Sequence, residues 1–373
     1  MTTKQIEDLQ KQTTLNFTAT TQVTAVEEFP QDVSVAIVTH NALSYLAATL
    51  ESLKAAGCPN EQITIVDVAS TDGGTDWVES QWSGVRVLRL DFNKGPNPAR
   101  NLGITSATTP YVLIMDADVM VQANTVFLLR TAMKQDPSIA IASPIVVYAN
   151  KPDTIQYAGT SLHFMCEAVN PWQGKPVYER GTEPQDIGCA SGCTLLISRA
   201  AAIRAGLFDN RYFAGKDDGD FTHRIKLAGY RIIEVPTAHV IHNCSPRGTK
   251  LFQHQIRNRW HFMLKNYQIR TLLLLAPILL LHELLQITLL TYKGHSIAYL
   301  KAILNLIKML PSLPSDRASV AKFRVRQDHE VLISSPILVR EDMLSNSFLC
   351  YCKTLYDSLL SNYWKLLRKT ILK

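Results

Sequence analysis

The feature that most constrains this chain is a series of apolar runs that each stop at polar or acidic residues. Three of these runs end in Thr39-His40-Asn41, in Asp67, and in Asp116-Ala117-Asp118, and an acidic cluster follows at 217–220. In an open α/β sheet, ligands bind where parallel strands end, at the carboxyl edge. Strands that deliver carboxylates to one edge can bind a divalent cation and the phosphates that it neutralises. The pattern therefore constrains the fold and the chemistry of the site together.

The spacing of the apolar runs predicts a mostly parallel sheet flanked by helices. We expect strands at 33–38, 62–68, 85–90, 111–115, 139–143 and 231–235. Asn41 is expected to cap a helix that runs to about Ala56. Strands that alternate with helical patterns favour a doubly wound α/β sheet. Residues 151–190 show no clear period and are expected to form loops, before a further apolar run at 192–198.

The charged residues are unevenly distributed: residues 1–250 are slightly acidic, and residues 251–373 are basic. Residues 251–373 contain 17 Lys and Arg against 7 Asp and Glu, although the net charge of the 373 residues is only +6. We expect a mobile arm at 1–31, an α/β domain at 32–250, a Leu-rich basic helical region at 251–312, and a basic tail with an amphipathic helix at 313–373. The basic residues are interleaved with Leu, which favours an anionic membrane surface over nucleic acid as the partner. A solvated, Lys-rich helical bundle is the alternative.

The Leu-rich stretch at 272–290 is long enough to cross a bilayer. Its Leu and Ile residues contribute about −0.3 to −0.6 kcal/mol each, whereas a central charge such as Glu283 costs about +3 kcal/mol. Lys and Arg flank both ends, so a single crossing would place one basic flank on the wrong side. Two interfacial or re-entrant helices, at 270–291 and 295–310, would keep every cation at the anionic leaflet. A helical hairpin packed on the protein's own core is the alternative.

The cysteines and the first residues indicate a cellular location. None of the seven cysteines has the spacing of a zinc site, and we interpret them as reduced thiols. The opening residues MTTKQIEDLQ contain no apolar stretch, so no signal peptide is predicted. We therefore expect a cytoplasmic protein that is peripherally associated with the inner face of the cell membrane. The terminal amphipathic segment, 363–369, fits a membrane interface or a second copy of the chain in a homo-oligomer.

Two strand ends carry carboxylates that each have a functional and a structural interpretation. After the apolar run at 111–115, Asp116 and Asp118 can face a sugar and a divalent cation. Asp67 can accept a hydrogen bond from the N–H of a nucleotide base. An Asx-turn is the alternative for Asp67, because the turn residues 70–73 follow it directly.

The later motifs suggest acid–base and anion chemistry. Neighbouring carboxylates at 217–220 raise one another's proton affinity, which suits one of them to act as a general base. Asp220 is expected to cap the helix that follows. His242 can be a neutral imidazole ligand to the same metal, although a structural His is the more common outcome. Arg100 opens a helix where it can meet a pyrophosphate, and a solvated helix Arg is the competing interpretation.

In this order the motifs resemble the family 2 glycosyltransferases, which have the nucleotide-sugar-binding, Rossmann-like GT-A fold. The resemblance covers about residues 33–250 and is closest to bacterial rhamnosyltransferase-like members. The matching segments are VAIVTHN, ITIVDVASTDGG, NKGPNPARNLGI, YVLIMDAD, the long segment at 190–232, and VIHN. The resemblance implies a GT-A catalytic domain with a C-terminal helical, membrane-associating extension.

The resemblance also implies a reaction and a set of site residues. It implies an inverting transfer that uses Mn²⁺ or Mg²⁺ and a UDP-, dTDP- or GDP-linked sugar donor. The acceptor is then a hydroxyl of a glycan or lipid-linked molecule at the cytosolic membrane face, in cell-surface polysaccharide or glycolipid synthesis. Asp218 is the implied base, Asp118 and His242 hold the metal, and Asp217 and Trp172 lie on the acceptor side. The implied donor-binding residues are Thr39, His40, Asn41, Asp67, Ser70, Lys94, Arg100 and Asp116.

The sequence departs from the family at several positions. The family often has Tyr at His40, Asn at Val68, and Glu at Asp217. Residues 255–260, QIRNRW, miss the QxxRW motif of processive synthases by one residue, which argues against processive synthesis. A sugar nucleotidyltransferase is disfavoured, because no Gly-rich basic loop follows the first strand. A catalytically silent scaffold of the same fold in a glycan assembly complex is the alternative function, although such a protein would be expected to have lost acidic positions.

Overall fold

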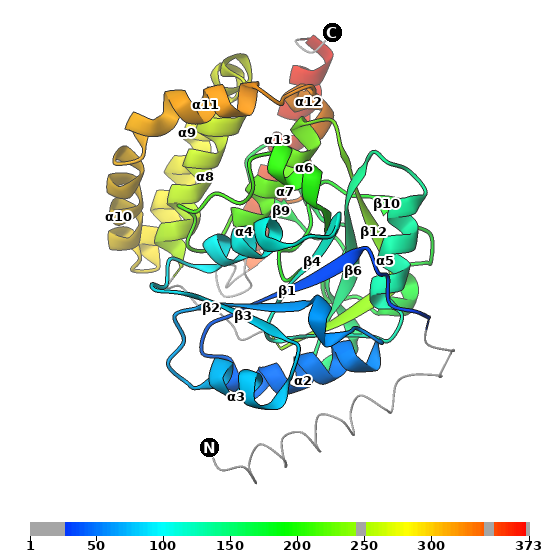
Figure 1. The fold of residues 1–373 in the computed structure, drawn as a ribbon. Helices are drawn as coiled ribbons and strands as arrows, with labels where there is room; N and C mark the ends of the chain where they lie inside the picture. The colour runs from blue at the N-terminus through cyan, green and yellow to red at the C-terminus, as the bar shows by residue number, and fades with distance from the viewer. Residues whose placement is uncertain (1–26, 244–250, 339–346, 371–373) are drawn as a thin grey trace.

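The computed structural model describes residues 27–243, 251–338 and 347–370, and Figure 1 shows a mixed sheet between layers of helices. The order of the 10-stranded sheet is β10-β12-β6-β11-β4-β1-β2-β3, with β5 paired to β12 and β7 paired to β6. The main strands are β1 (Val33–Thr39), β2 (Ile63–Val68), β3 (Arg86–Leu90), β4 (Tyr111–Asp116), β6 (Ile139–Tyr148), β11 (Thr194–Ser198) and β12 (Arg231–His242). All six strands predicted from apolar runs are present.

The sheet is mostly parallel, as the sequence predicts. Strand β1 pairs in parallel with β2 and β4, β2 with β3, and β6 with β12. Strand β11 is inserted antiparallel between β4 and β6. The parallel strands therefore place their carboxyl ends along a common edge, where a ligand site is expected.

The prediction that residues 151–190 form loops is only partly right. This stretch contains β7 (Lys151–Tyr157), β8 (Ser161–Leu162), β9 (Ala168–Val169) and β10 (Gln185–Asp186). Three of these strands have only 2 residues, and the first three residues of β7 are exposed. Short strands and polar edge strands have no hydrophobic periodicity, so the sequence carries little signal for them.

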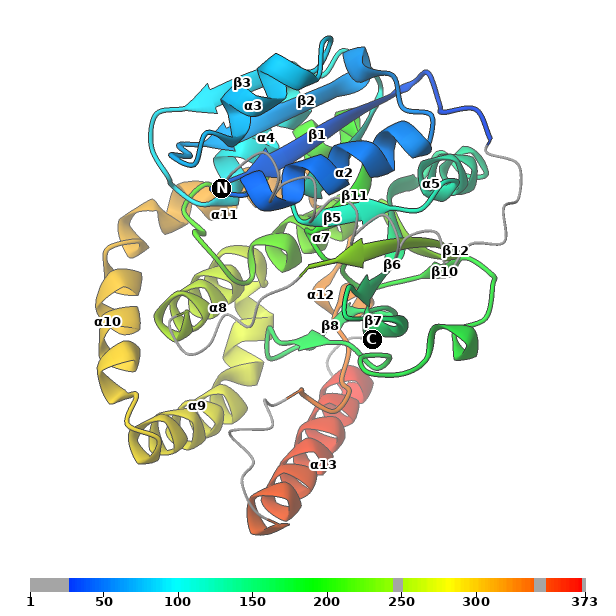
Figure 2. The same ribbon diagram turned by 90° about the horizontal axis from the view of Figure 1, so that it is seen from below.

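Helices cover both faces of the sheet. On one face lie α2 (Leu43–Ala55), α3 (Gly74–Gln81) and α5 (Thr125–Lys134), and on the other lie α4 (Pro96–Ser106), α6 (Arg199–Arg204) and α7 (Asp217–Leu227). The first core contains Ile37, Leu50 and Leu129, and the second contains Ile114 and Phe221. Figure 2 shows α2 lying along β1. Two buried layers on one sheet give the doubly wound architecture.

The expected cap of the first helix is wrong. Asn41 has a left-handed backbone with φ 50°, and Ala42 occupies the N-cap position without a side-chain bond. The backbone N–H of Leu43 instead donates to Asp72 Oδ2 at 2.8 Å. The side-chain oxygen of Asn41 accepts the N–H of Thr71 at 2.8 Å. A carboxylate from a distant loop therefore caps the helix, which a local pattern cannot reveal.

The predicted N-terminal arm lies mostly outside the described residues, which begin at Glu27. Phe29 is buried in the first core, together with Val33 and Val35. Asp32 is bonded to Arg130 on α5, with Oδ2 2.6 Å from a guanidinium nitrogen. The folded domain therefore begins before residue 32.

The last third of the chain, from α8 onward, is helical in the described residues and packs on the α/β domain. Its helices are α8 (Phe252–Asn266), α9 (Ile269–Tyr292), α10 (Ser296–Ile307), α11 (Leu313–Ala321), α12 (Asp328–Val331) and α13 (Ser347–Thr370). Phe262, Leu275 and Trp364 share a core with Phe164 from the α/β domain. The rings of Phe164 and Trp364 stack with centroids 4.8 Å apart. This region is thus continuous with the domain.

Two polar residues in the middle of the Leu-rich helix α9, His282 and Glu283, face the protein. His282 Nδ1 lies 2.8 Å from the hydroxyl of Tyr356 on α13. Glu283 is paired with Arg259 on α8, and it accepts the hydroxyl of Tyr299 on α10 at 2.6 Å. His282 and Glu283, which would be costly in a bilayer, therefore each have a partner inside the protein, although the Nε2 of His282 has none among the described residues.

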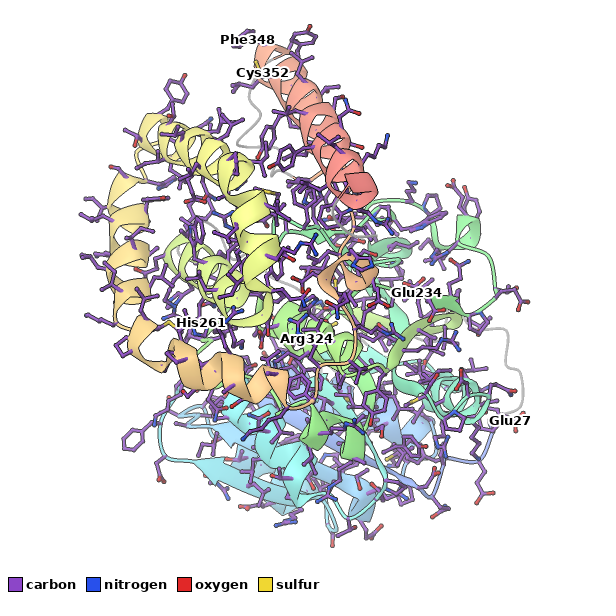
Figure 3. The ribbon with its side chains drawn as sticks, turned by 90° about the horizontal axis from the view of Figure 1, so that it is seen from above. Glu27, Glu234, His261, Arg324, Phe348 and Cys352 are labelled. Atoms are coloured by element: carbon purple, nitrogen blue, oxygen red, sulfur yellow. The ribbon has the colours of Figure 1, made fainter. Side chains whose placement is uncertain are left out.

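The outward faces of α9, α10 and α13 are apolar. Two stretches, Ile269–Tyr292 and Ser296–Ala321, are long and apolar enough to cross a membrane, and only 17% and 11% of them are buried. Figure 3 shows Phe348 and Cys352 at the far end of α13. The exposed large apolar residues include Leu273, Leu280, Leu284, Ile297, Leu300, Leu304, Tyr351, Leu355 and Leu359, which we call the apolar face. Exposed apolar side chains that gather on one part of a protein usually mark an interaction site.

Candidate active site

The polar residues at the strand ends meet at the carboxyl edge. Val38 lies opposite Asp116, and Thr39 lies opposite Asp67, in the parallel pairs of β1. The N–H of Asp116 donates to the carbonyl of Cys193 at 2.9 Å. Thr39 is buried, and among the described residues its hydroxyl has no hydrogen-bond partner. The predicted donor-binding residues of β1, β2 and β4 are thus neighbours.

The two loops after β1 and β2 are bonded to each other. His40 Nδ1 lies 2.7 Å from the carbonyl of Val68, and the N–H of Asn41 donates to Ser70 Oγ at 2.8 Å. Asp67 accepts the N–H of Ser70 at 3.1 Å and also its hydroxyl. Asp67 thus has a structural role in the turn that follows it, although the bond reaches Ser70, three residues on, where an Asx-turn would reach the second residue. Recognition of a base by Asp67 stays a prediction.

Arg100 lies between two of the predicted carboxylates. Its guanidinium is 3.1 Å from Asp116 Oδ1 and 2.9 Å from Asp217 Oδ2, and it donates to Asn97 Oδ1 at 3.3 Å. Its side chain is only 6% exposed, so the solvated alternative is wrong. Arg100 holds the two carboxylates in place, and its contact with a nucleotide stays a prediction.

Burial and the oppositely charged partner have opposite effects on the pKa of Arg100 and on that of Asp217. Burial disfavours the charged form of Arg100, but Asp116 and Asp217 outweigh it and hold its pKa above the ordinary value. Burial, followed by the charge of Asp218, raises the pKa of Asp217 above its ordinary value, although Arg100 opposes the shift. Arg100 therefore remains a cation, and the negative charge around it is shared among closely spaced carboxylates.

Two backbone N–H groups orient Asp218. Gly192 donates to its Oδ2 at 3.1 Å, and Gly219 donates to its Oδ1 at 2.8 Å. A Cβ at Gly192 would lie 3.1–3.2 Å from the guanidinium of Arg100, so glycine leaves room for that group. Asp218 is thus held in one orientation beside the Arg100 ion pairs, as a general base requires.

The predicted role of Asp220 as a helix cap is wrong. Helix α7 begins at Asp217 with Lys216 at the N-cap position, so Asp220 lies within the first turn. Its side chain is completely buried, 2.9 Å from Arg224 and 2.8 Å from Lys265. Asn266 on α8 also donates to it at 2.7 Å. Asp220 anchors α7 to the C-terminal helices.

Asp118 and His242 form the pair predicted to bind a metal. His242 Nε2 lies 3.6 Å from Asp118 Oδ1, because β12 pairs with β5 (Val119–Val121) next to Asp118. His242 Nδ1 lies 2.8 Å from Gln156 Oε1. Since the amide oxygen can only accept, Nδ1 donates to it and Nε2 faces Asp118. Gln156 was not predicted, because nothing in its local sequence marks it.

The donor atoms of this pair fit a divalent cation. An imidazole and a carboxylate suit Mn²⁺, and carboxylate and phosphate oxygens suit Mg²⁺. Within residues 27–243, 251–338 and 347–370, no group of three or more His, Cys, Asp and Glu side chains is arranged to hold a metal. A cation bound by Asp118 and His242 would therefore take its other ligands from substrate or water.

The remaining predicted residues lie farther out. Lys94 is exposed in the loop before α4. Trp172 lies under the cations of Lys175 and Arg180, at 4.5 and 5.1 Å from its ring centre. Arg180 is in turn paired with the buried Glu234 at 2.7 Å. The structure thus places Trp172 in a cluster beside β7, and its role toward an acceptor stays a prediction.

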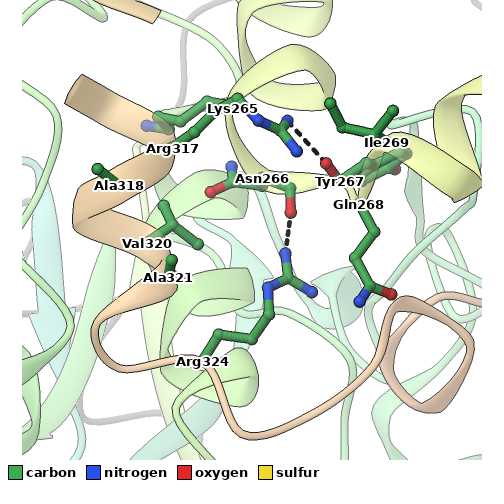
Figure 4. Close-up of a pocket in the computed structure, with 10 residues that line it drawn as sticks. All are labelled: Lys265, Asn266, Tyr267, Gln268, Ile269, Arg317, Ala318, Val320, Ala321 and Arg324. Atoms are coloured by element: carbon green, nitrogen blue, oxygen red, sulfur yellow. Dashed lines mark hydrogen bonds between the residues drawn. The ribbon is translucent and has the colours of Figure 1, made fainter. Parts of the chain in front are cut away.

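A pocket of about 400 Å³ lies elsewhere, where α8 ends, α9 begins and α11 packs against both (Figure 4). Arg317 donates to the carbonyl of Tyr267 at 2.8 Å, and Arg324 donates to that of Asn266. These cations satisfy carbonyls at the end of α8, which a helix terminus requires. None of the predicted site residues is among those that line this pocket.

A GT-A nucleotide-sugar-binding fold with acidic residues at its carboxyl edge is the class of protein that this architecture defines. In agreement, the structure is similar to that of GalNAc-T7, solved with UDP, GalNAc and Mn²⁺, with a TM-score of 0.54 and 18% identity. The match covers 72% of this chain but only 58% of that one, and at this identity it shows the fold alone.

Sequence comparisons define the family. The family model described as Glycosyl transferase family 2 matches residues 34–206, and this domain of the chain belongs to that family. The chain is 27% identical over 231 residues to N-acetylglucosaminyl-diphospho-decaprenol L-rhamnosyltransferase of Mycobacterium tuberculosis, covering 56% of this chain and 75% of that protein. It is 28% identical over 219 residues to the pre-mycofactocin glycosyltransferase of the same species, covering 57% and 43%. The protein is a glycosyltransferase, similar to rhamnosyltransferases.

Proposed function

We propose that this protein is an inverting, metal-dependent glycosyltransferase that transfers a sugar from a nucleoside-diphosphate donor to an acceptor hydroxyl. The observation that carries the proposal is the position of Asp218. Its carboxylate is oriented by the N–H groups of Gly192 and Gly219, beside Arg100 and its ion pairs. The Asp118–His242 pair lies where β12 ends and the paired strand β5 begins, in the same sheet. A base and a cation site at one edge are the parts that single-displacement transfer needs.

Each group of site residues has its own role in the proposed reaction. Asp118 and His242 would hold Mn²⁺ or Mg²⁺, which supplies positive charge to the diphosphate as it leaves. The donor lies along the ends of β1, β2 and β4, where Thr39, Asp67 and Asp116 meet. Asp218 takes the proton of the acceptor hydroxyl, whose oxygen bonds to the anomeric carbon as the bond to the diphosphate breaks. Attack opposite the leaving group inverts the anomeric configuration.

We further propose a glycan or lipid-linked acceptor at the cytosolic face of the membrane, in cell-surface polysaccharide or glycolipid synthesis. The apolar face of α9, α10 and α13 supports this location, because His282 and Glu283 of α9 are turned inward. Exposed basic residues accompany this face and suit anionic lipid head groups. They include Arg270, Lys301, Lys308, Lys365 and Arg368. The similarity to a decaprenol-linked rhamnosyltransferase agrees with a lipid-linked acceptor.

Nucleotide-dependent thermal stabilisation tests the donor site. Purified protein is heated with UDP, dTDP or GDP, each with and without Mn²⁺ or Mg²⁺. A ligand that binds only the folded state raises the midpoint of unfolding. We expect one nucleotide to raise it only when the cation is present, and the same nucleotide to do so in Asp218→Asn. Folded protein that responds to no nucleotide would contradict the proposed donor site.

Vesicle flotation tests the location. The substitutions Leu280→Asp and Leu284→Asp introduce charge on the apolar face, at side chains that are both 64% exposed. We expect wild type to float with mixed phosphatidylglycerol–phosphatidylcholine vesicles and the double variant to remain behind, because burying a charge in an interface is costly. Tyr178→Asp is the matched control, since Tyr178 is 83% exposed in the α/β domain. Equal flotation of all three proteins would contradict docking through this face.

A further inference from the structure

Helix α8 runs along the segment at 209–216 that leads into the acidic residues of α7. Arg257 donates to the carbonyl of Arg211 at 2.9 Å, and His261 Nδ1 lies 2.8 Å from the hydroxyl of Tyr212. Lys265, farther along the helix, is 2.9 Å from Asp209. Residues on one side of α8 thus hold this segment along its length.

The segment ends in two consecutive residues with left-handed backbones. Gly215 has φ 79° and Lys216 has φ 65°. The second is costly for a residue with a Cβ, and such conformations persist only where the surroundings enforce them. Lys216 is the N-cap of α7, so its backbone sets the direction in which Asp217 and Asp218 leave the loop. The orientation of the proposed base therefore depends on what holds this left-handed pair.

Asn258 provides that support. Its side-chain NH₂ donates to the carbonyl of Gly215 at 2.7 Å and to that of Ala214 at 3.2 Å. Its side-chain oxygen accepts from Arg257 Nε at 2.8 Å, so the amide cannot rotate without losing bonds. Asn258 is fully buried, which strengthens these bonds and excludes water as a substitute. Both carbonyls lie immediately before Lys216.

Helix α8 also meets the apolar helices on its other side. Arg259 follows Asn258 directly and is paired with Glu283 of α9. Lys216 Nζ is 2.5 Å from Glu167 Oε2, whose other oxygen is 4.0 Å from Arg259 Nε. The left-handed pair is therefore held from the backbone by Asn258 and from the side chain by Glu167. Of these contacts, only those of Asn258 reach the peptide groups that set the backbone direction.

We infer that Asn258 is a positioning residue for glycosyl transfer, because it fixes the left-handed Gly215–Lys216 pair and thereby the direction of Asp218. This inference rests on the proposed role of Asp218 as base. Asn258 is 40 positions from Asp218 in the sequence, and its bonds end at the loop backbone. Its loss should therefore affect the chemical step and not the binding of the donor nucleotide.

Asn266 offers a matched control on the same helix. It is also a fully buried Asn, and its side-chain NH₂ donates a hydrogen bond to Asp220 Oδ1 of α7. Asp220 is additionally held by Arg224 and Lys265, so it keeps two charged partners without Asn266. Asn258→Ala and Asn266→Ala therefore remove similar bonds, but only the first frees the left-handed pair.

The test measures kcat, donor KM and nucleotide-binding stoichiometry for wild type, Asn258→Ala, Asn266→Ala and Asp218→Asn. We expect Asn258→Ala to lower kcat at least tenfold while donor KM and stoichiometry stay within twofold of wild type. Asn266→Ala should keep the wild-type kcat. If Asn258→Ala does not fold, Asn258→Ser, whose hydroxyl can donate to one of the two carbonyls, should show a smaller fall in kcat in the same direction.

Two results would overturn the inference. One is a wild-type kcat in folded Asn258→Ala or Asn258→Ser, and the other is an equal fall in Asn258→Ala and Asn266→Ala. Asp218→Asn separates this failure from failure of the proposed function. If Asp218→Asn retains turnover, the assignment of the base is wrong, whereas if it is inactive and only Asn258→Ala is normal, the positioning role alone is wrong.

Discussion

Arg100 and Asp217 are 117 positions apart in the chain and form a buried ion pair of 2.9 Å. Arg100 lies in the middle of α4, and Asp217 at the start of α7. The same guanidinium binds Asp116 at the end of β4. One cation thus joins a strand end and two helices, and it fixes the distances among carboxylates that the proposed reaction uses.

This pairing predicts a large loss of stability when Arg100 is neutralised. Arg100→Met should lower the free energy of unfolding by about 3–5 kcal/mol, because it leaves buried carboxylates without a partner. Arg231→Met is the matched control, since Arg231 also joins two carboxylates, Asp136 and Asp186, but is 37% exposed. Its loss should cost no more than about 1 kcal/mol. Urea denaturation measures both, and equal losses would contradict the burial argument.

The close approach of Gly192 to Arg100 predicts a position-specific loss of activity. Gly192→Ala places a Cβ 3.1–3.2 Å from the guanidinium of Arg100, which must shift together with its carboxylates. We expect kcat to fall by up to about tenfold, since the guanidinium must move by a few tenths of an ångström and a misplacement of about 1 Å costs about 100-fold. Gly219→Ala is the control, because its Cβ would meet nothing within 4 Å and it keeps the N–H that serves Asp218. Initial rates of the two variants should differ, and equal rates would rule out the steric explanation.

The bond between Gln156 and His242 predicts an effect on metal affinity. Gln156→Leu removes the acceptor that orients the imidazole and should weaken Mn²⁺ affinity about 10–100-fold. Titration of Mn²⁺ by electron paramagnetic resonance, in the presence of the stabilising nucleotide, measures this. Gln173→Leu provides the comparison, because Gln173 is exposed and bonded only to the hydroxyl of Tyr148 among the described residues. Equal affinities in the two variants would mean that His242 does not bind the ion.

Buried histidines predict a fall in stability at acid pH. Burial, followed by the charge of Arg324, lowers the pKa of His223 from 6.5 to about 3. Between these values the unfolded chain binds a proton that the folded protein excludes, so stability falls as pH falls from about 6.5 toward 3. The slope for one such histidine approaches about 1.4 kcal/mol per pH unit.

Urea denaturation at several pH values between 6 and 4.5 tests this linkage. His223→Leu removes the titrating group while keeping the site apolar, beside Phe262 and Tyr267. The variant should therefore lose stability less steeply with acid than wild type, by about 1 kcal/mol per pH unit. Parallel curves for the two proteins would show that His223 is already charged in the folded state.

Much of the fold could be predicted because the central strands are buried on both faces. Continuous apolar runs such as 33–38 and 111–115 mark such strands, and the polar residues that end them mark the carboxyl edge. The edge strands at 151–190 lack this signal. The caps were missed for a related reason, because Asp72 reaches the start of α2 from another loop and Asp220 is turned into the interior.

The sequence alone was sufficient to place Thr39, Asp67, Asp116 and Asp118 at one edge, since the period of each strand and the point where it stops are local properties. It did not show that Arg100 binds two carboxylates, that Gln156 orients His242, or that Asn258 holds the loop before Asp218. These contacts join residues far apart in the chain, and they exist only because α4, α7 and α8 pack together and because β7 and β12 lie in one sheet. Local periodicity specifies which face of an element is buried, whereas the partner it meets there depends on the arrangement of the whole fold.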